Sequence, residues 1–459
     1  MASEIRVNKI ENRSGLGTVT FADTGVDLAG IVTATTFSGS GASLTALPSA
    51  QLSGALPAIS AASLTNVPAA NVVGVHTSLT VTNATTTGTV VVGGGVTISE
   101  SGIEASGIGI TCANINGTQI GGRRNIIING AMNVAQRGTS FNQAADGSYT
   151  LDRFAAFRNG AGIMDIEQST TVPSGEGFKK SLKCTVDTAD SSLGSTDFGG
   201  FFHKIEGQDI NQFEFGSSSA KQFTLSFFVR SNITGTYSVA FRNGSANRYL
   251  VKEYTISSAD TWQKITITDT ADLTGTWASD NTTGLQINWC LWEGGFTAAP
   301  NTWGSNNIIG STNNVNWVET VGNTFYLTGV QLELGSQATA FEHRSFAEER
   351  LLCKRYYHQL PATDTQGSVG GYLFLSKPAY YESESYYFPV EMRAAPTMTT
   401  SNTWILRAYG AGSNTAATEV INSRVERFYV TSSASNTNTS YVWILGADSN
   451  TPLKIDAEL

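Results

Sequence analysis

The stretch "KQFTLSFFVRS", from Lys221 to Ser231, places apolar residues at every second position. Side chains of a strand point alternately to the two faces of a sheet, so this pattern predicts a strand with one buried face. The segments "YSVAFRNG", "WQKITITDT", "GLQINWCLWEG" and "NTFYLTGVQLELG" repeat it, and turns rich in Asn, Gly, Ser and Asp separate them. Many short antiparallel strands with one buried face predict a sandwich of the jelly-roll kind in the middle of the chain.

The composition excludes several classes of function. Only 14% of the 459 residues are charged, and the formal net charge is -9, so a general affinity for nucleic acid or anionic membranes is not expected. No apolar run approaches the roughly 20 residues that cross a bilayer, so membrane insertion is not expected either. The cysteines at 112, 184, 290 and 353 stand far apart and are interpreted as separate thiols in a chain folded in a reducing cytoplasm.

The N-terminal quarter has the features of an extended stalk. Residues Ile31 to Ser99 include no Asp, Glu, Lys or Arg, and residues Ser38 to Ser140 include no Phe, Tyr or Trp. The segments "SLTALPSAQLSG" (Ser43–Gly54) and "SLTNVPAANVVG" (Ser63–Gly74) repeat at a spacing of 20. A repeat with few large side chains predicts quasi-one-dimensional stacking of several identical chains. A disordered Thr/Ser/Gly linker is the alternative.

Two segments mark the limits of the middle block. In "RRNIIINGAMNVAQRG" (Arg123–Gly138), we expect Ile126, Ile127 and Ile128 to form the first strand of the core. In "RSFAEERLLCKRYYHQLP" (Arg344–Pro361), acids come early and bases late, which predicts a helix that ends at the proline. Short strand patterns then return and continue to Leu459.

The chain resembles the tail fibre proteins of bacteriophages, in particular those of marine cyanobacterial phages. The residues that carry the resemblance are "IRVNKIENRSGLGTVTF", "NIIINGAMNVAQRGTSF", "YTLDRF", "TFYLTGVQLELGSQATAFEHRSFAEERLLCKRYYHQL", "FPVEMRAAPTMT" and the terminal "DAEL". The resemblance implies a homotrimer, located in the virion after synthesis in the host cytoplasm, whose N-terminus docks on a phage tail or baseplate protein.

The expected fold class is mainly β. It is an elongated homotrimeric fibre with an N-terminal virion-docking segment, a repetitive β stalk, a jelly-roll β-sandwich, a short connecting helix and a C-terminal β-sandwich tip. The expected domains are residues 1–40 for virion attachment, 41–122 for the stalk, 123–343 for a domain similar to carbohydrate-binding modules, 344–361 for the helix and 362–459 for the receptor-binding tip.

Catalytic chemistry has little support in the sequence. There is no nucleophile elbow, phosphate loop or H-E-x-x-H pair, and the four histidines are scattered. No catalytic residue, metal site or cofactor is therefore expected. The acids Asp152, Glu206, Asp209, Glu333 and Glu342 lie in different segments, and a structural role is favoured for Asp152 and Glu333.

Sugar binding needs flat aromatic faces and short amide or hydroxyl groups. Trp303 and Trp317 bracket the Asn-rich tract "GSNNIIGSTNNVN", although a core role for both tryptophans is the alternative. In the distal block, Trp404 and Tyr409 flank a strand that carries Arg407. Loops there contain Asn414, Asn436 and Asn438. These eight residues are the receptor-binding candidates.

We therefore expect a non-enzymatic adhesin that attaches the virion to a host cell-surface glycan, with lipopolysaccharide as the favoured receptor. Two alternatives stay open. One is a depolymerase that cleaves the same glycan with paired carboxylates, and the other is a structural connector that holds another fibre protein.

Overall fold

The computed structural model describes residues 9–11, 18–23, 25–28, 90–92, 96–99, 102–105, 123–360, 368–377, 380–383, 385–399, 404–408, 414–416, 418–433, 443–447 and 452–459. The chain divides into two compact units, Met1–Ser106 and Gly107–Leu459. The described part of the first unit forms two small antiparallel sheets. Their strands are β1 (Lys9–Glu11), β2 (Thr18–Ala22) and β3 (Gly25–Leu28), then β4 (Val90–Val92), β5 (Val96–Ser99) and β6 (Gly102–Ala105). The repeats expected to form the stalk lie outside the described residues.

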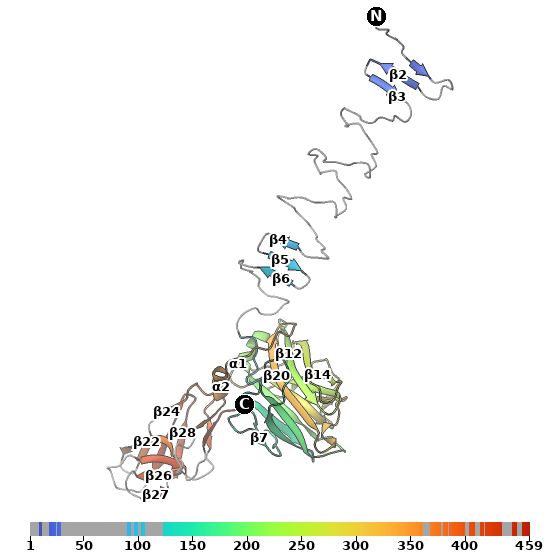
Figure 1. Ribbon diagram of the computed structural model, residues 1–459. Helices are drawn as coiled ribbons and strands as arrows, with labels where there is room; N and C mark the ends of the chain where they lie inside the picture. The colour runs from blue at the N-terminus through green and yellow to red at the C-terminus, as the bar shows by residue number, and fades with distance from the viewer. Residues whose placement is uncertain are drawn as a thin grey trace. The chain divides into compact units, whose positions relative to one another are not determined.

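The second unit begins with two six-stranded sheets that share one core (Figure 1). The first sheet has the order β15-β12-β20-β10-β9-β7, and the second has the order β18-β14-β13-β16-β11-β8. The strands of the first are β7 (Ser140–Phe141), β9 (Ile163–Ser169), β10 (Ser181–Thr188), β12 (Gln222–Ser231), β15 (Gln263–Thr270) and β20 (Thr324–Leu334). Those of the second are β8 (Phe154–Asn159), β11 (Phe198–Glu206), β13 (Gly235–Asn243), β14 (Arg248–Ile256), β16 (Thr283–Glu293) and β18 (Gly304–Ser305).

The period-two pattern of β12 is the reason why the sheets pack face to face. Phe223, Leu225, Phe227 and Val229 are buried in the shared core. The Phe227 ring meets the Trp289 ring of β16 edge to face, with 5.9 Å between ring centroids. Burial of one such side chain contributes about 1.5–3 kcal/mol. The predicted mainly β fold with a sandwich is confirmed.

The start of the sandwich differs from the expectation. Residues 123–138 form turns and irregular structure, so the strand predicted at Ile126–Ile128 is wrong, although Ile127 is fully buried in the core. Two backbone bonds join the segment to β20, from Ile126 N to the Leu332 carbonyl and from Val330 N to the Gly130 carbonyl, each 3.0 Å, and the Asn125 side chain adds to them. Its Oδ1 accepts from Ile127 N (3.0 Å) and Leu332 N (3.1 Å), and its Nδ2 donates to the Val330 carbonyl (3.1 Å). This side chain anchors the segment to β20 without regular pairing.

The helix after the sandwich is shorter than predicted. Helix α2 (Phe346–Lys354) begins after Ser345, whose side chain accepts from Glu348 N, and β21 (Tyr357–Leu360) follows it. Tyr356 and Tyr357 are consecutive and both buried. Tyr356 lies in the turn before β21, where its ring packs against the Arg153 guanidinium and its hydroxyl donates to Glu206 (2.5 Å). The Tyr357 ring packs against the Arg137 guanidinium.

The remaining described strands form two sheets. In the first, β31 (Leu453–Asp456) lies between β21 and β25 (Thr397–Thr399). The second is eight-stranded, with the order β24-β29-β23-β22-β30-β26-β27 and β28 paired to β29. Its strands are β22 (Ser368–Lys377), β23 (Tyr380–Ser383), β24 (Tyr386–Tyr387), β26 (Trp404–Ala408), β27 (Asn414–Ala416), β28 (Thr418–Ser423), β29 (Arg427–Ser433) and β30 (Trp443–Ala447).

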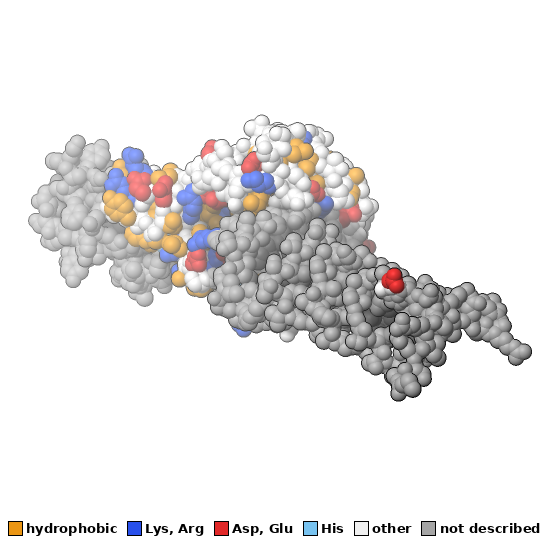
Figure 2. All heavy atoms as spheres, turned by 90° about the horizontal axis from the view of Figure 1, so that it is seen from above, with side chains coloured by type: hydrophobic (Ala, Val, Ile, Leu, Met, Phe, Trp, Pro, Cys, Tyr) orange, Lys and Arg blue, Asp and Glu red, His pale blue; other side chains and the backbone are white. Residues whose placement is uncertain are grey.

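Three of the four cysteines lie within the described residues, and Cys184, Cys290 and Cys353 are buried free thiols. Among the described helices, none is long and apolar enough to span a membrane. On the face drawn in Figure 2, acidic and basic side chains are interspersed among uncharged polar atoms. Among the described residues on that face, basic side chains form no broad patch.

Replacing Ile127 with aspartate places a carboxylate in the core without a partner. We expect Ile127→Asp to lower the free energy of unfolding by about 3–5 kcal/mol. Val321→Asp, at an exposed position, is the matched control and is expected to change it by about 0.5 kcal/mol or less. Denaturant unfolding followed by tryptophan fluorescence measures both, and equal midpoints for the two variants would contradict the core position of Ile127.

Candidate functional site

A polar row crosses the outer face of the second sheet. Tyr249 on β14 pairs with Arg242 on β13, Arg242 pairs with Gln286 on β16, and Gln286 pairs with Lys204 on β11. Residues directly opposite one another in a ladder share a face of the sheet. Asn288, two positions after Gln286, lies on the same face. We call these five residues, together with Asn307 above them, the Arg242 site.

Arg242 is buried without a charged partner. Its side chain is 8% exposed, and its Nη2 donates to Asn307 Oδ1. Its Nε has no partner among the described residues, and none of the ion pairs there includes Arg242. Burial lowers the pKa of the guanidinium to about 10. Because an unpaired buried charge is costly, the fold keeps this cation at the expense of stability.

Asn288 is a second buried donor with a free hydrogen-bonding group. It is 1% exposed, and its Oδ1 accepts from Gln286 Nε2 at 2.7 Å. This bond fixes the amide, so that Nδ2 is the group left over, and Nδ2 has no partner within the described part of the chain. The site therefore combines donors that lack acceptors.

The Asn-rich tract lies across this outer face. Asn307 contacts Arg242, and Ile309 packs with Phe202 in a small apolar cluster. Ser311 donates its backbone N–H to Ser238 Oγ (3.2 Å) and its hydroxyl to Glu253. The tract was singled out in the sequence. Arg242 and Asn288, which lie beneath it, were not among the predicted binding residues. The sequence feature that could have indicated Arg242 is an arginine at an outward position of the otherwise uncharged strand "YSVAFRNG".

The two tryptophans that bracket the tract have different positions. Trp317 is fully buried and stacks on Trp292 with 6.1 Å between ring centroids, so it offers no ring face to a ligand. Trp303 is half-buried, and its Nε1 donates to the Thr270 carbonyl at 2.8 Å. Its ring meets Phe215 and Trp277 edge to face, at centroid distances of 6.0 Å and 5.7 Å.

The distal candidates are only partly covered by the structure. Trp404 and Arg407 belong to β26, and Arg407 pairs in register with Asn414 at the start of β27, so the loop position predicted for Asn414 is wrong. Tyr409, Asn436 and Asn438 lie outside the described residues. The structure therefore brings together only Arg407 and Asn414 among these five.

The acids considered for catalysis have structural partners. Asp152 accepts from Gln136 N and Nε2, both at 2.6 Å. Glu333 accepts from Thr339 N and Oγ1, and Glu342 accepts from the backbone N–H groups of Arg124 and Asn125. These bonds agree with the structural role favoured for Asp152 and Glu333.

The other two of these acids lie near one another. Glu206 accepts two bonds of 2.8 Å from Arg355 and one of 2.5 Å from Tyr356. Burial, together with the charge of Glu206, raises the pKa of Asp209. Within the described residues, no group of three His, Cys, Asp or Glu side chains could hold a metal ion.

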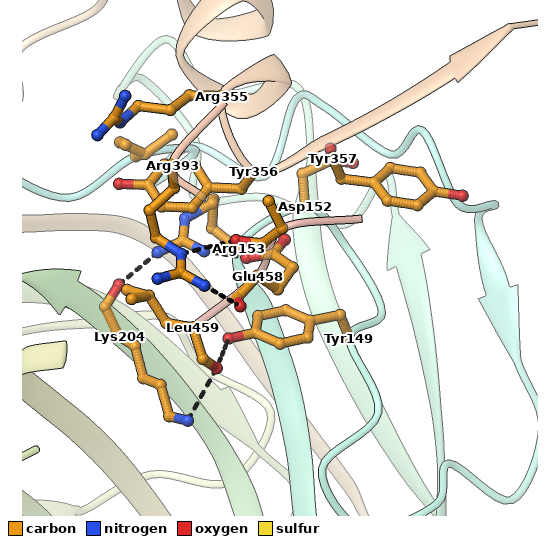
Figure 3. A network of polar contacts seen from close by, with 12 residues as sticks. Tyr149, Asp152, Arg153, Lys204, Arg355, Tyr356, Tyr357, Arg393, Glu458 and Leu459 are labelled. Carbon is orange, nitrogen blue, oxygen red and sulfur yellow. Dashed lines mark hydrogen bonds and ion pairs between the residues drawn. The ribbon is translucent and has the colours of Figure 1, made fainter. Parts of the chain in front are cut away.

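A buried ion pair lies beside the Arg242 site (Figure 3). Arg153 pairs with Glu458, lies over the Tyr356 ring at 3.4 Å from its centroid, and donates through Nη2 to the Lys204 carbonyl at 2.6 Å. Both side chains of the pair are almost fully buried. The pair therefore links the sandwich to the C-terminal segment and to Tyr356, in the turn that follows α2.

The C-terminal residues extend this network. The main-chain oxygen of Leu459 accepts from Lys204 Nζ (2.9 Å) and from the Tyr149 hydroxyl (3.0 Å). Arg393 donates to the carbonyls of Ala457 (2.7 Å) and Glu458 (2.9 Å). Figure 3 shows these side chains converging from the sandwich, the segment after α2 and the distal part. Lys204 belongs both to this network and to the Arg242 site, so the C-terminal segment fixes one end of that site.

The comparisons with known proteins give likenesses in structure alone. No protein-family model matches the sequence, and no curated protein matches it. The tailspike protein 4 enzymatically active domain of bacteriophage CBA120 is 14% identical with a TM-score of 0.25, and the match covers 42% of this chain and 21% of the tailspike. A family 11 carbohydrate-binding module of a Clostridium thermocellum cellulase is 11% identical with a TM-score of 0.22, over 45% of this chain and 98% of the module. A CBM61 module in complex with β-1,4-galactotriose is 8% identical with a TM-score of 0.23, over 47% of this chain and 100% of the module.

Removing the cation of the buried pair leaves Glu458 with Arg137 alone, at 3.3 Å. We expect Arg153→Met to lower the free energy of unfolding by about 3–5 kcal/mol, and the addition of Glu458→Gln to restore part of the loss. Arg230→Met breaks the more exposed pair with Asp260 and is expected to cost about 1 kcal/mol or less. Chemical denaturation of the full chain measures these values. An Arg153→Met chain as stable as Arg230→Met would show that the pair does not hold the junction.

Proposed function

We propose that the protein is a non-enzymatic tail fibre adhesin that binds a host cell-surface glycan through the Arg242 site and so attaches the virion. Lipopolysaccharide is the favoured receptor, and a tail or baseplate protein is the partner of the N-terminus. The domain limits given above belong to this proposal. The bacteriophage tail fibre motifs support the setting in a virion, and the Arg242 site supports the binding of sugar.

The observation that carries the proposal is a pair of buried donors without acceptors. The Nε of Arg242 and the Nδ2 of Asn288 lack partners within the described residues and lie on one face of adjacent strands. A sugar presents hydroxyl and ring oxygens, which accept such bonds. The desolvation cost of both donors is met when the chain folds, so a ligand gains the hydrogen bonds without that cost. Half-buried Tyr249 adds an aromatic ring in the same row.

A homotrimer would strengthen binding at such a site. One shallow sugar site gives weak affinity, whereas linked copies raise the overall affinity by about 10²–10⁴ through effective concentration. Helix α2 supports association of chains, because Phe346 is 57% and Leu351 45% exposed. These residues line a groove of about 230 Å³ together with Ala347, Arg350 and Lys354. Contiguous exposed apolar side chains commonly mark an interaction surface.

The depolymerase alternative keeps one supporting observation. Burial raises the pKa of Glu293 to about 7, and its Oε1 has no partner within the described residues. A carboxyl that stays protonated near neutral pH can serve as a general acid. Hydrolysis would need a second carboxylate across the scissile bond.

Loss of the two donors should weaken glycan binding. We expect Arg242→Gln and Asn288→Ala each to raise the dissociation constant for host lipopolysaccharide by about 10- to 100-fold, the equivalent of one good hydrogen bond. Arg230→Gln, on the first sheet, should leave it unchanged. Binding of the full chain to host cells and to purified lipopolysaccharide measures the effect. Near-ultraviolet circular dichroism checks that each variant is folded.

The same samples separate the alternatives. Binding that persists unchanged in both variants would place the receptor site elsewhere. Sustained release of reducing ends from the polysaccharide would favour the depolymerase, and absence of binding to intact host cells would favour the structural connector.

The surface of α2 should control assembly. We expect Leu351→Glu combined with Phe346→Glu to convert the trimer to single chains, because charged side chains in an apolar interface lose hydration on association. Val321→Glu, at an exposed site in the sandwich, is the control and should remain trimeric. Light scattering gives the mass of each. An unchanged mass in the double variant would exclude α2 from the contact between chains.

A further inference from the structure

The charges around the Arg242 site are unbalanced. Arg242 and Lys204 share one row, and the pKa of Lys204 is lowered by burial and further by the charges of Arg153 and Arg242. Glu458, whose charge acts on Lys204, is already paired with Arg153 and Arg137, and Lys204 Nζ donates to the Leu459 oxygen (2.9 Å). Glu253, on the same outer face, lies opposite Ser238. Ser238 is four residues from Arg242, or about 13 Å along the strand. The Glu253 carboxylate already accepts hydrogen bonds from Ser311 and Asn313.

Other arginines of this unit show what Arg242 lacks. Arg248 holds Asp272 through Nε (2.6 Å) and Nη2 (2.8 Å). Arg355 holds Glu206 through the same two nitrogens, each at 2.8 Å. In both cases the Nε–Nη2 edge of the guanidinium donates to two carboxylate oxygens at once. In Arg242 the same edge carries only the neutral amide oxygen of Asn307 on Nη2, while Nε has no partner among the described residues.

We infer that the Nε–Nη2 edge of Arg242 binds an oxyanion carried by the glycan, a carboxylate or a phosphate, and that the substrate class is therefore an acidic saccharide. This inference rests on the proposed function and adds the chemical class of the ligand. Asn307 Oδ1 occupies the position of one oxygen of the anion. Asn288 Nδ2 lies on the same face to bind the rest of the group, while Lys204, whose Nζ is held by the Leu459 oxygen, adds positive charge in the same row.

Asn307 supplies a sharp test because it is exposed and already contacts the guanidinium. Asn307→Asp changes one group of similar size and brings a carboxylate of the chain itself to Arg242. We expect it to compete with the ligand and to weaken binding of an acidic glycan by at least about tenfold. Asn306→Asp, at the exposed neighbouring position, adds the same charge without that contact. We expect it to weaken binding much less.

The experiment uses the full chain, immobilised host polysaccharide, and free competitors with and without an anionic group. These are D-glucose, D-glucuronate, D-glucose 6-phosphate and inorganic phosphate. We expect one or both acidic sugars to compete and glucose to fail, and the preference for the charged sugar to disappear in Arg242→Gln. Competition by glucuronate alone identifies a carboxylate, and competition by glucose 6-phosphate alone identifies a phosphate. Affinity should also fall as salt is raised.

The outcomes separate this inference from the proposed function. Polysaccharide binding with equal competition by glucose and the acidic sugars would overturn the inference and leave glycan binding intact. Competition by inorganic phosphate without either acidic sugar would show an adventitious anion site and also overturn it. Equal effects of Asn307→Asp and Asn306→Asp would show a general effect of charge, and would overturn it as well. No binding to the polysaccharide at all would instead contradict the proposed function.

Discussion

The buried ion pair between Arg153 and Glu458 is the interaction on which the arrangement of the second unit depends. It joins the turn before β8 to the segment after β31, and the Tyr356 ring packs against the guanidinium. Taking two ions out of water costs several kcal/mol each, so such a pair adds little stability compared with apolar side chains of the same volume. Its effect is instead on specificity. Separating Arg153 from Glu458 would leave a buried charge uncompensated, so arrangements of the C-terminal segment that break the pair are disfavoured.

The sandwich could be predicted because its signal is local. Apolar residues at 223, 225, 227 and 229 need only their own strand to show which face is buried. The segment Arg123–Gly138 also allowed the core residue Ile127 to be predicted. Its backbone path, however, depends on hydrogen bonds between the Asn125 side chain and β20, more than 200 residues away. The length of α2 was overestimated for a similar reason. The strand that follows is set by pairing with Leu453–Asp456, which no local pattern of residues 344–361 reveals.

The Arg242 site could not be predicted, because it exists only through register. Arg242, Gln286 and Lys204 come from three segments of the sequence, and they lie side by side only when β13, β16 and β11 pair as they do. The Asn-rich tract above them could be recognised from the sequence, because its composition is a property of one continuous segment. Trp317 shows that composition can also mislead. It adjoins the Asn-rich tract in the sequence, yet its side chain is buried in the core. Other buried donors of the described residues also lack a partner, such as Nε1 of Trp289 and Trp317. Arg242 differs from the paired arginines because none of the ion pairs within the described residues includes it.

The position of β31 has a consequence for how the protein is made. Residues 453–459 are synthesised after residues 123–360, yet they provide the central strand of a three-stranded sheet, the partner of Arg153 and the oxygen that holds Lys204. The junction of a nascent chain therefore stays incomplete until residues 453–459 leave the ribosome. Until then Arg153 and Lys204 lack the partners that they have in the folded protein. Chains that lack residues 453–459 would keep that defect and differ from chains that contain them in surface charge and hydration. The fold thus makes synthesis of residues 453–459 a condition for the junction between the sandwich and the distal sheets.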